Sequence, residues 1–368
     1  MAARYLVTGG LGFIGRYLCR ELLDQGAEVR VLDGLVDQVH GGSHPEPEPG
    51  VEAIVADVRD AEAVRAALDG VDGVFHLAAE VGVGQSMYEI GRYVGANDLG
   101  TAVLLEQMIA RPVPRIVVAS SMSVYGEGLY RTADGRRVDR ARRKAARVRA
   151  GLWEPVGPGG EALEPIPTDE EKPVDLASIY ALTKYAQERA CLIFGDAYGV
   201  DAVALRLFNV FGAGQALSNP YTGVLANFAS RLLNGERPLI FEDGAQKRDF
   251  VDVRDVARAF RLAMTEPRAA GEVINVGSGR AYSVADVARI VARALGKDIP
   301  PEILLKARSG DIRNCFADIG KARDLLGFEP RHRLENSLDG FAEWVLASTA
   351  TDRAAEMRRE LERRGLVT

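Results

Sequence analysis

The chain has 368 residues, of which 47% are hydrophobic and 27% are charged, and its formal net charge is -6 at pH 7. This composition is typical of a globular enzyme, and the acidic balance argues against the basic surface that a nucleic-acid partner requires. At roughly 150 residues per domain, the length allows two lobes. No apolar run reaches the about 18 residues that a membrane span needs, so we expect no membrane partner.

The cysteines predict neither a disulfide framework nor a metal site. Cys19, Cys191 and Cys315 lie far apart in the sequence, and two of them fall in apolar helical patterns. The first strand begins within a few residues of the initial Met, which leaves no room for a signal peptide. We therefore expect a cytoplasmic protein without bound metal.

The opening segment predicts a nucleotide cradle. Residues 5–7 form a short apolar run that suits a buried parallel strand, and apolar residues recur at helical spacing afterwards. Between them lies the pattern G-x-x-G-x-x-G, which lets backbone N–H groups approach a pyrophosphate at the positive N terminus of a helix. We expect the cofactor to contact Gly9, Gly12, Phe13, Ile14 and Gly15.

A carboxylate follows at the distance that such a cradle requires. The second strand, residues 28–33, ends in Asp33, eighteen residues past Gly15. A carboxylate here accepts hydrogen bonds from the adenosine ribose. Because it would repel a 2′-phosphate, Asp33 favours NAD over NADP. The alternative is an acid that only caps a loop.

Strands and helices continue to alternate. The pattern predicts a Rossmann-type, doubly wound parallel sheet with its ligands beyond the carboxyl ends of the strands. Asp57 and Val58 would then meet the adenine, although Asp57 is about equally suited to capping the next helix. The residues Leu77, Ala78 and Ala79 would let a cofactor pass. We expect strands at 51–57, 73–79 and 115–121, and helices at 61–68 and 96–109.

Residues 127–173 form the one irregular segment. Eight lysine or arginine side chains lie between residues 136 and 149. We interpret this run as the solvated face of a helix, with a clamp over an acidic ligand or a neighbouring subunit as the alternative. Residues 153–160 have the turn density of a small knuckle, but they contain no Cys or His to bind a metal.

Regular structure returns with a strong helix that begins at Ser178. Tyr180 and Lys184 stand four residues apart on it, so they share one face. A strand at 203–208 follows, and from residue 213 onward mixed elements predict a smaller α/β substrate lobe. Its helices are expected at 224–234, 283–295 and 336–346, and its strands at 238–241 and 272–279.

Three motifs together resemble the extended short-chain dehydrogenase/reductase family, and within it the NAD-dependent nucleotide-sugar epimerases and dehydratases. They are the glycine turn, the Tyr180-x-x-x-Lys184 pair, and the segments 120–126 and 206–212 on either side of it. The resemblance covers almost the whole chain. It implies that Tyr180 is the general base, that Ser121 holds the reacting hydroxyl, and that Lys184 grips the nicotinamide ribose. We expect the ammonium and the cationic nicotinamide to lower the pKa of Tyr180.

The two residues after Ser121 narrow the choice of reaction within the family. Dehydratases of the family carry an Asp-Glu pair there, whereas this chain has Met122 and Ser123, which cannot transfer protons usefully. We therefore expect a 4-epimerase, which oxidises C4, lets the 4-keto sugar rotate and returns the hydride. The resemblance implies that a nucleotide diphosphate sugar is bound by Ser121, Ser123, Asn209, Arg248 and Arg308, with Arg248 pairing to Asp249 as the alternative.

Within the family, the chain is most similar to the dTDP-L-rhamnose 4-epimerases or the UDP-sugar 4-epimerases. The likeness to the former lies in residues 218–223 and the long insertion. The resemblance also implies a homodimer formed through 96–109 and 180–198. We assign residues 1–212 to the cofactor domain and 213–368 mainly to the substrate lobe. A 4-ketosugar reductase and a non-enzymatic NAD-sensing regulator remain as alternatives, and the sequence leaves the base and the sugar open.

Overall fold

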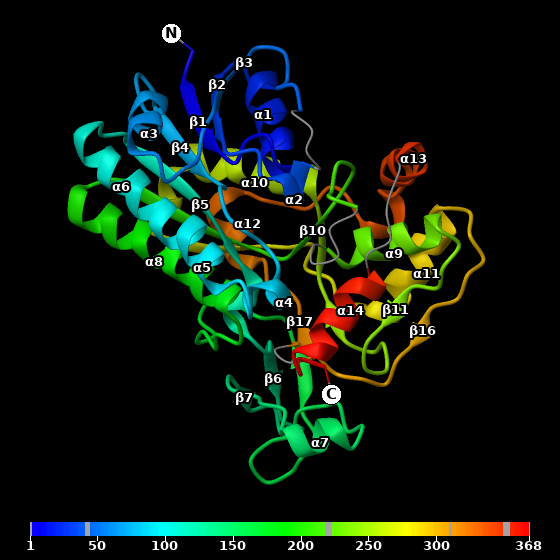
Figure 1. Ribbon diagram of the computed structural model, residues 1–368. Coiled ribbons are helices and arrows are strands. Elements are labelled where there is room, and N and C mark those ends of the chain that lie inside the picture. The colour runs from blue at the N-terminus through cyan, green and yellow to red at the C-terminus, as the bar shows by residue number, and fades with distance from the viewer. Residues whose placement is uncertain (1, 41–44, 218–222, 309–310, 349–353, 368) are drawn as a thin grey trace.

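The computed structural model describes residues 2–40, 45–217, 223–308, 311–348 and 354–367. Its centre is a seven-stranded sheet in the order β14-β9-β5-β4-β1-β2-β3 (Figure 1). Every pairing in this sheet is parallel. The strands are β1 (Arg4–Thr8), β2 (Glu28–Asp33), β3 (Val51–Val55), β4 (Gly73–His76), β5 (Arg115–Ser121), β9 (Asp201–Leu207) and β14 (Val273–Val276).

Helices cover both faces of the sheet because successive strand residues point to opposite sides. Val7 packs into the core beneath α1, α10 and α12, whereas its neighbour Leu6 packs into the core beneath α3, α6 and α8. This is the predicted doubly wound Rossmann-type fold. The covering helices are α1 (Phe13–Asp24), α10 (Val253–Thr265), α12 (Gly320–Leu326), α3 (Ala61–Ala67), α6 (Gly100–Ala110) and α8 (Ile179–Tyr198).

The single helix predicted at 96–109 is instead a π-helical turn, η1 (Val94–Leu99), that runs into α6. Asn97 faces inward, where its side chain bonds both backbone groups of Glu80 and the Thr183 hydroxyl. A π turn adds a residue and rotates the buried face. Leu99, the last residue of this turn, is 53% exposed.

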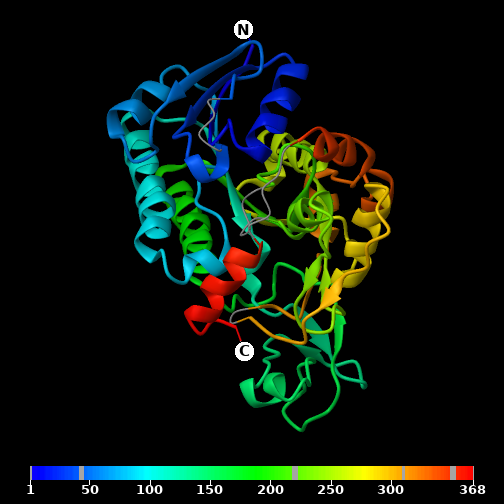
Figure 2. The same cartoon turned by 45° about the vertical axis from the view of Figure 1, so that its right-hand side comes forward.

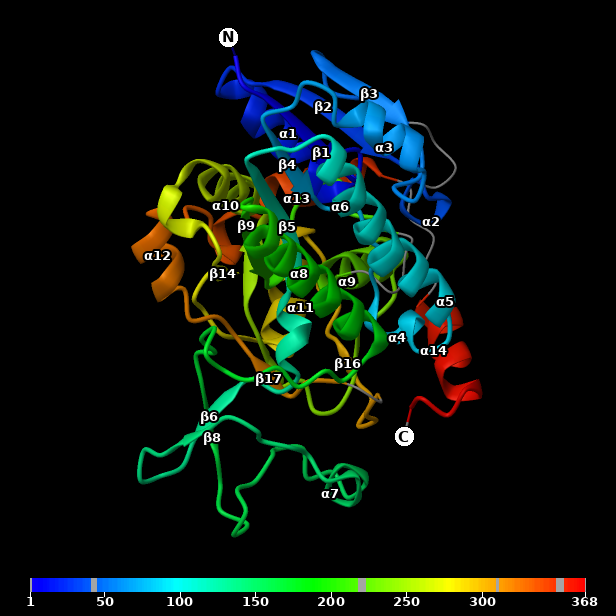
Figure 3. The same cartoon turned by 90° about the vertical axis from the view of Figure 1, so that its left-hand side faces the viewer.

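A second core lies beside the sheet, under α9 (Val224–Leu233), α11 (Val284–Ala294) and α13 (Asp339–Ala347). Ser283 caps α11 through the backbone N–H of Asp286, as the sequence predicts. The C-terminal helix α14 (Ala354–Arg363) lies beside α4 (Val83–Ser86) and α5 (Ile90–Tyr93) (Figures 2 and 3). The short strands are β10 (Asn209–Phe211), β11 (Leu239–Ile240), β12 (Lys247–Arg248), β13 (Phe250–Asp252), β15 (Tyr282–Ser283), β16 (Glu302–Ile303) and β17 (Asn314–Cys315).

The segment 127–173 projects from the body of the molecule (Figure 3). Its basic run is not one solvated helix, because only α7 (Ala145–Arg149) is helical. Arg137 pairs with Asp139 and Asp169, and the buried Arg143 pairs with Glu127 and Glu242. Asp169, Glu127 and Glu242, which are distant in sequence, thus hold parts of the run against the rest of the protein. The strands are β6 (Leu129–Arg131), β7 (Arg137–Val138) and β8 (Glu164–Ile166).

The remaining short helices connect these elements, and none of the helices within the described ranges is long and apolar enough to cross a membrane. They are α2 (Asp37–His40), η2 (Met122–Tyr125), η3 (Pro267–Ala269) and η4 (Leu334–Asn336).

Candidate active site

The glycine turn connects β1 to α1 at the point where the strand order reverses. In the described part of the chain no side chain caps α1, whose N-cap is Gly12, so its first amides are free for an anion. A Cβ at Gly15 would lie 2.4 Å from the carbonyl oxygen of Gly9. One at Gly9, where φ is +71°, would lie 2.9 Å from the nitrogen of Ala78. The turn therefore requires glycine at both positions.

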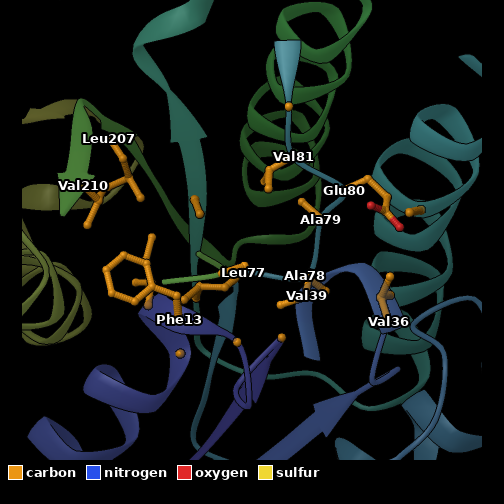
Figure 4. Close-up of a pocket in the computed structure, with 18 of the residues that line it drawn as sticks. Phe13, Val36, Val39, Leu77, Ala78, Ala79, Glu80, Val81, Leu207 and Val210 are labelled. Atoms are coloured by element: carbon orange, nitrogen blue, oxygen red, sulfur yellow. The ribbon is translucent and has the colours of Figure 1, made fainter. Parts of the chain in front are cut away.

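A cavity of about 610 Å³, the first cavity, opens above this turn (Figure 4). Phe13 from α1, Leu77 after β4 and Leu207 at the end of β9 surround it. All the predicted cofactor and catalytic residues line it: Gly9, Gly12, Phe13, Ile14, Gly15, Asp33, Asp57, Val58, Leu77, Ala78, Ala79, Ser121, Tyr180 and Lys184.

Asp33 lines the first cavity and also braces the turn. Its carboxylate accepts hydrogen bonds from the backbone N–H groups of Leu11, at 3.0 Å, and Leu35, at 2.9 Å. Asp33 therefore does cap the loop, which is one part of its role. A carboxylate has about four acceptor sites, so capacity for ribose hydroxyls remains.

Asp57 does not cap the following helix. The cap of α3 is Asp60, which accepts from the N–H groups of Glu62 and Ala63. Asp57 instead accepts two bonds from the Arg59 guanidinium, at 2.9 and 2.6 Å, and these hold its pKa below the usual value. The capping alternative is wrong because the helix begins three residues later than that reading requires.

Ser121, Tyr180 and Lys184 meet at one wall of the first cavity. Ser121 ends β5, and its hydroxyl hydrogen-bonds to Ser123, at 3.1 Å, and to Tyr180. Its neighbour Ser120 faces the other side of the sheet and donates to Glu188, at 2.6 Å. Both residues border the cavity, but strand alternation leaves the Ser121 hydroxyl, and not that of Ser120, beside Tyr180.

The electrostatics of Tyr180 differ from the sequence expectation. Burial raises the pKa of the Tyr180 phenol, and only the hydrogen bond with Ser121 opposes that rise. Lys184 is not among the groups that lower it, and its ammonium donates to the side-chain oxygen of Gln187, at 2.7 Å. Burial also lowers the pKa of Lys184 to about 8.

Behind Lys184 lies a buried polar network that the sequence reasoning missed. Gln187 Nε2 donates to the hydroxyl of Thr101, at 2.9 Å, and this hydroxyl lies 2.8 Å from His76 Nε2. His76 Nδ1 lies 2.8 Å from the Thr8 hydroxyl. Burial lowers the pKa of His76 to about 3, helped by Lys184. Only the spacing of Lys184 and Gln187, one helical turn, hinted at this contact.

A second cavity, of about 300 Å³, adjoins the first and shares Ser123 and Asn209 with it. Arg248 and Arg308, which the resemblance assigns to the substrate, line it. Arg248 donates to the carbonyl oxygens of Lys247 and Arg313, at 2.9 and 3.0 Å, and to that of Ile312.

Arg248 therefore does not pair with Asp249. The Asp249 carboxylate accepts bonds from the backbone N–H groups of Ser278, Gly279 and Ala317 instead. The alternative of a structural Arg248–Asp249 pair is wrong, because adjacent residues in an extended strand point to opposite sides. Arg308 pairs with Asp311, at 2.9 Å, and its guanidinium lies 4.5 Å from the centre of the Phe241 ring.

The second cavity also contains residues that no sequence motif indicated. Arg231 from α9 lines it, as do three apolar side chains of the C-terminal segment: Met357, Leu361 and Leu366. Glu362 pairs with Lys306, at 3.0 Å, and the Arg364 guanidinium lies 4.0 Å from the centre of the Tyr88 ring. The i, i+4 spacing of Met357 and Leu361 was the available signal. The loop at 218–222 falls outside the described residues.

Comparisons with known proteins agree with this geometry. The family model described as NAD dependent epimerase/dehydratase matches residues 5–277. The chain is 36% identical over 349 residues to a dTDP-L-rhamnose 4-epimerase from Burkholderia thailandensis, covering 93% of this chain and 94% of that protein.

Two solved structures are similar over nearly their whole length. A UDP-N-acetylglucosamine 4-epimerase from Methanobrevibacter ruminantium, in complex with UDP-N-acetylmuramic acid, has a TM-score of 0.78 at 30% identity, covering 95% of this chain and all of that one. MoeE5 in complex with UDP-glucuronic acid and NAD has a TM-score of 0.76 at 31% identity, covering 94% and 100%.

The first cavity fits NAD. It offers an uncapped helix N terminus for the pyrophosphate, the Asp33 carboxylate for the adenosine ribose, and a path over glycine backbone that a Cβ would obstruct. The protein is therefore an enzyme with NAD as its cofactor, and the chain belongs to the NAD-dependent epimerase/dehydratase family.

Proposed function

We propose that the protein is a nucleotide-sugar 4-epimerase that acts on a dTDP- or UDP-linked hexose such as dTDP-L-rhamnose. One observation carries the proposal: Ser121, Tyr180 and Lys184 line a cavity that adjoins a second cavity containing Arg231, Arg248 and Arg308. Oxidation chemistry and diphosphate recognition thus lie side by side. The similarity to the dTDP-L-rhamnose 4-epimerase supports the choice of sugar.

The reaction needs one proton moved in each direction at the sugar C4 hydroxyl. Tyr180 removes that proton as general base and returns it later, while the hydroxyl of Ser121 holds the C4 oxygen. Lys184 holds the nicotinamide ribose and keeps positive charge at this wall. Bound NAD would supply reversible hydride transfer at C4, and the charge of its ring would favour the Tyr180 phenolate.

The carboxylates that line the two cavities argue against a dehydratase. Among the described residues they are Asp33, Asp57, Glu80 and Asp311. Asp33 accepts from backbone amides, and the other three each pair with an arginine. Elimination of water needs an acid and a base held beside the sugar, and all four groups are already engaged elsewhere.

The second cavity supplies the cation that a nucleotide diphosphate requires. Burial lowers the pKa of Arg248, whose hydrogen bonds within the described structure go to carbonyl oxygens, so an anionic ligand would stabilise its charge. Arg308 adds a second guanidinium for phosphate oxygens. We propose that Ser123 and Asn209 contact the sugar and diphosphate between these arginines and Tyr180, with residues 1–212 holding the cofactor and 213–368 most of the substrate.

We also propose a homodimer in the cytoplasm. Apolar side chains are exposed along η1, α6 and α8, which lie side by side (Figure 3). They are Val94, Leu99, Ile109, Leu182, Ile193 and Tyr198. Sedimentation equilibrium should give a dimer, and Ile193→Arg should weaken it. The three buried free thiols support a reducing compartment.

The test of the proposed activity uses protein purified without added cofactor. Denaturation should release NAD, which chromatography identifies. Native protein is then incubated with dTDP-L-rhamnose, UDP-glucose or UDP-glucuronate, and each sugar is followed by NMR. Interconversion of the C4 stereoisomers of one sugar supports the epimerase and identifies the substrate. Turnover of a 4-keto sugar only with added reduced cofactor would replace the proposal with a reductase.

A further inference from the structure

The polar network behind Lys184 is closed to solvent and joins three elements. Lys184 and Gln187 are on α8, Thr101 is on α6, and His76 ends β4; each of these side chains is at most 3% exposed. Gln187 Nε2 also donates to the carbonyl oxygen of Ala78, at 3.3 Å. Because Ala78 lines the first cavity, the network links Lys184 to backbone at the wall of that cavity.

One hydroxyl fixes the direction of the hydrogen bonds that meet at Thr101. Thr101 has a single proton, which it donates to the carbonyl oxygen of Asn97, at 2.6 Å. Its oxygen must therefore accept from His76 Nε2 and from Gln187 Nε2. His76 is thus the neutral Nε2–H tautomer, and its Nδ1 accepts from the Thr8 hydroxyl.

The same assignment locks the amide of Gln187. Both of its N–H groups have acceptors, in Thr101 and Ala78, so its oxygen must face Lys184. Rotating the amide by half a turn would place an N–H group against the ammonium and leave the buried acceptors unpaired, which is costly.

The other groups around Lys184 leave the side-chain oxygen of Gln187 as the partner of its ammonium within the described structure. Its titratable neighbours are His76 from β4 and Tyr180, Glu188 and Cys191 from α8. Glu188 is occupied by Arg206, at 2.7 Å, and by Ser120. His76 stays neutral, and Cys191 is a buried thiol. Within the described structure, the Gln187 oxygen is the direct hydrogen-bond acceptor of the ammonium.

We propose that Gln187 is a positioning residue that, held in one orientation by Thr101 and His76, keeps the Lys184 ammonium charged and directed at the wall of the first cavity. The inference rests on the proposed role of Lys184 in catalysis. It adds that this role depends on a neutral amide, and on a threonine and a histidine that do not touch the cavity-facing ammonium.

The test measures the titration of Lys184 directly, in the NAD-containing enzyme without substrate. Proteins labelled with ¹³C at lysine Cε are followed by NMR against pH, and the Lys184 signal is identified by its absence in Lys184→Arg. Gln187→Met should lower the Lys184 midpoint by about one pH unit, because the charged form loses a hydrogen bond. Gln187→Glu should raise it, because a carboxylate stabilises the ammonium.

Thr101 provides the matched pair of variants. Thr101→Val keeps the shape of the side chain but removes the acceptor for Gln187, so it should lower the midpoint by less than Gln187→Met does. Thr101→Ser keeps the hydroxyl and should leave the midpoint unchanged. Circular dichroism and melting temperature establish that each variant is folded, and the Thr101 pair decides the question if Gln187→Met does not fold.

Activity gives a second measurement. In Gln187→Met, kcat should fall about tenfold at neutral pH. The dependence of kcat/KM on pH should become narrower in this variant, whereas Thr101→Ser should keep the wild-type pH dependence. An unchanged Lys184 midpoint in folded Thr101→Val, or the same shift in both Thr101 variants, would overturn the proposal. If no sugar is epimerised yet the midpoints shift as expected, the proposed function fails and the positioning role stands.

Discussion

The two cavities that meet at Ser123 and Asn209 are built in different ways. The first is formed by backbone and strand ends: the turn from Gly9 to Gly15, the end of β2 at Asp33 and the end of β5 at Ser121. The second is formed by side chains from α9, β12, the segment before residue 313 and the C-terminal helix α14. Sheet geometry fixes the first cavity, whereas the second depends on which side chains the lobes bring together.

The largest loss of activity is expected at Tyr180, which lies at the wall of the first cavity where both ligands would meet. Tyr180→Phe should reduce turnover at least about a hundredfold, because the general base is lost while the ring remains. NAD content and melting temperature should stay unchanged, since the glycine turn is untouched. Tyr185→Phe on the same helix is the control. Near-normal turnover in Tyr180→Phe would contradict the mechanism.

The backbone character of the first cavity is tested at Gly15. In Gly15→Ala the new Cβ would meet the backbone of Gly9 and Gly10 at 2.4–2.6 Å, and backbone cannot turn aside as a side chain can. We expect a loss of about 1–3 kcal/mol in the free energy of unfolding, together with lower NAD content after gel filtration. Gly91→Ala, whose Cβ meets no atom within 4 Å, is the control. Full NAD content in Gly15→Ala would show that the turn adapts.

The same difference explains what could be read from the sequence. The strands β2 and β5 lie where the periodicity predicts them, and the ends of both supply predicted residues, Asp33 and Ser121. The glycine turn was predictable because its function is carried by consecutive backbone groups. The candidate catalytic pair on α8 was predictable because helical spacing alone places Tyr180 and Lys184 on one face.

The sequence could not indicate contacts between segments that are far apart in the chain. Asn97 faces inward because its side chain bonds to Glu80 and Thr183. The basic run from Arg136 to Arg149 folds back because it forms ion pairs with Asp169 and Glu242. The pKa of Tyr180 moves opposite to the expectation because the folded chain buries its phenol. Each difference arises from tertiary packing rather than from local sequence.

The protonation of His76 tests whether water reaches the buried network behind the first cavity. The pKa of His76 is about 3 in the folded protein, against the ordinary 6.5. Because the unfolded chain binds the extra proton between these values, stability is present above pH 6.5 and is lost as the pH falls towards 3.

The expected size of this effect at pH 5 is ~2 kcal/mol, from the about 1.5 pH units below 6.5. Urea unfolding at pH 7.5 and pH 5 should show the wild type losing that much more stability than His76→Gln, which cannot titrate in this range. Equal losses in the two proteins would mean that His76 is reached by water and protonated in the folded state.

The smallest effect is expected in the second cavity, at Arg308, because side chains there share their task with other arginines. Arg308→Met should raise KM for the nucleotide sugar about tenfold, the loss of one charge-assisted hydrogen bond to phosphate, and leave both kcat and NAD content close to wild type. Arg280→Met, on an exposed arginine outside both cavities, should change neither constant. A fall in NAD content in Arg308→Met would mean that the two cavities bind their ligands jointly, since a side chain of the second would then support the first.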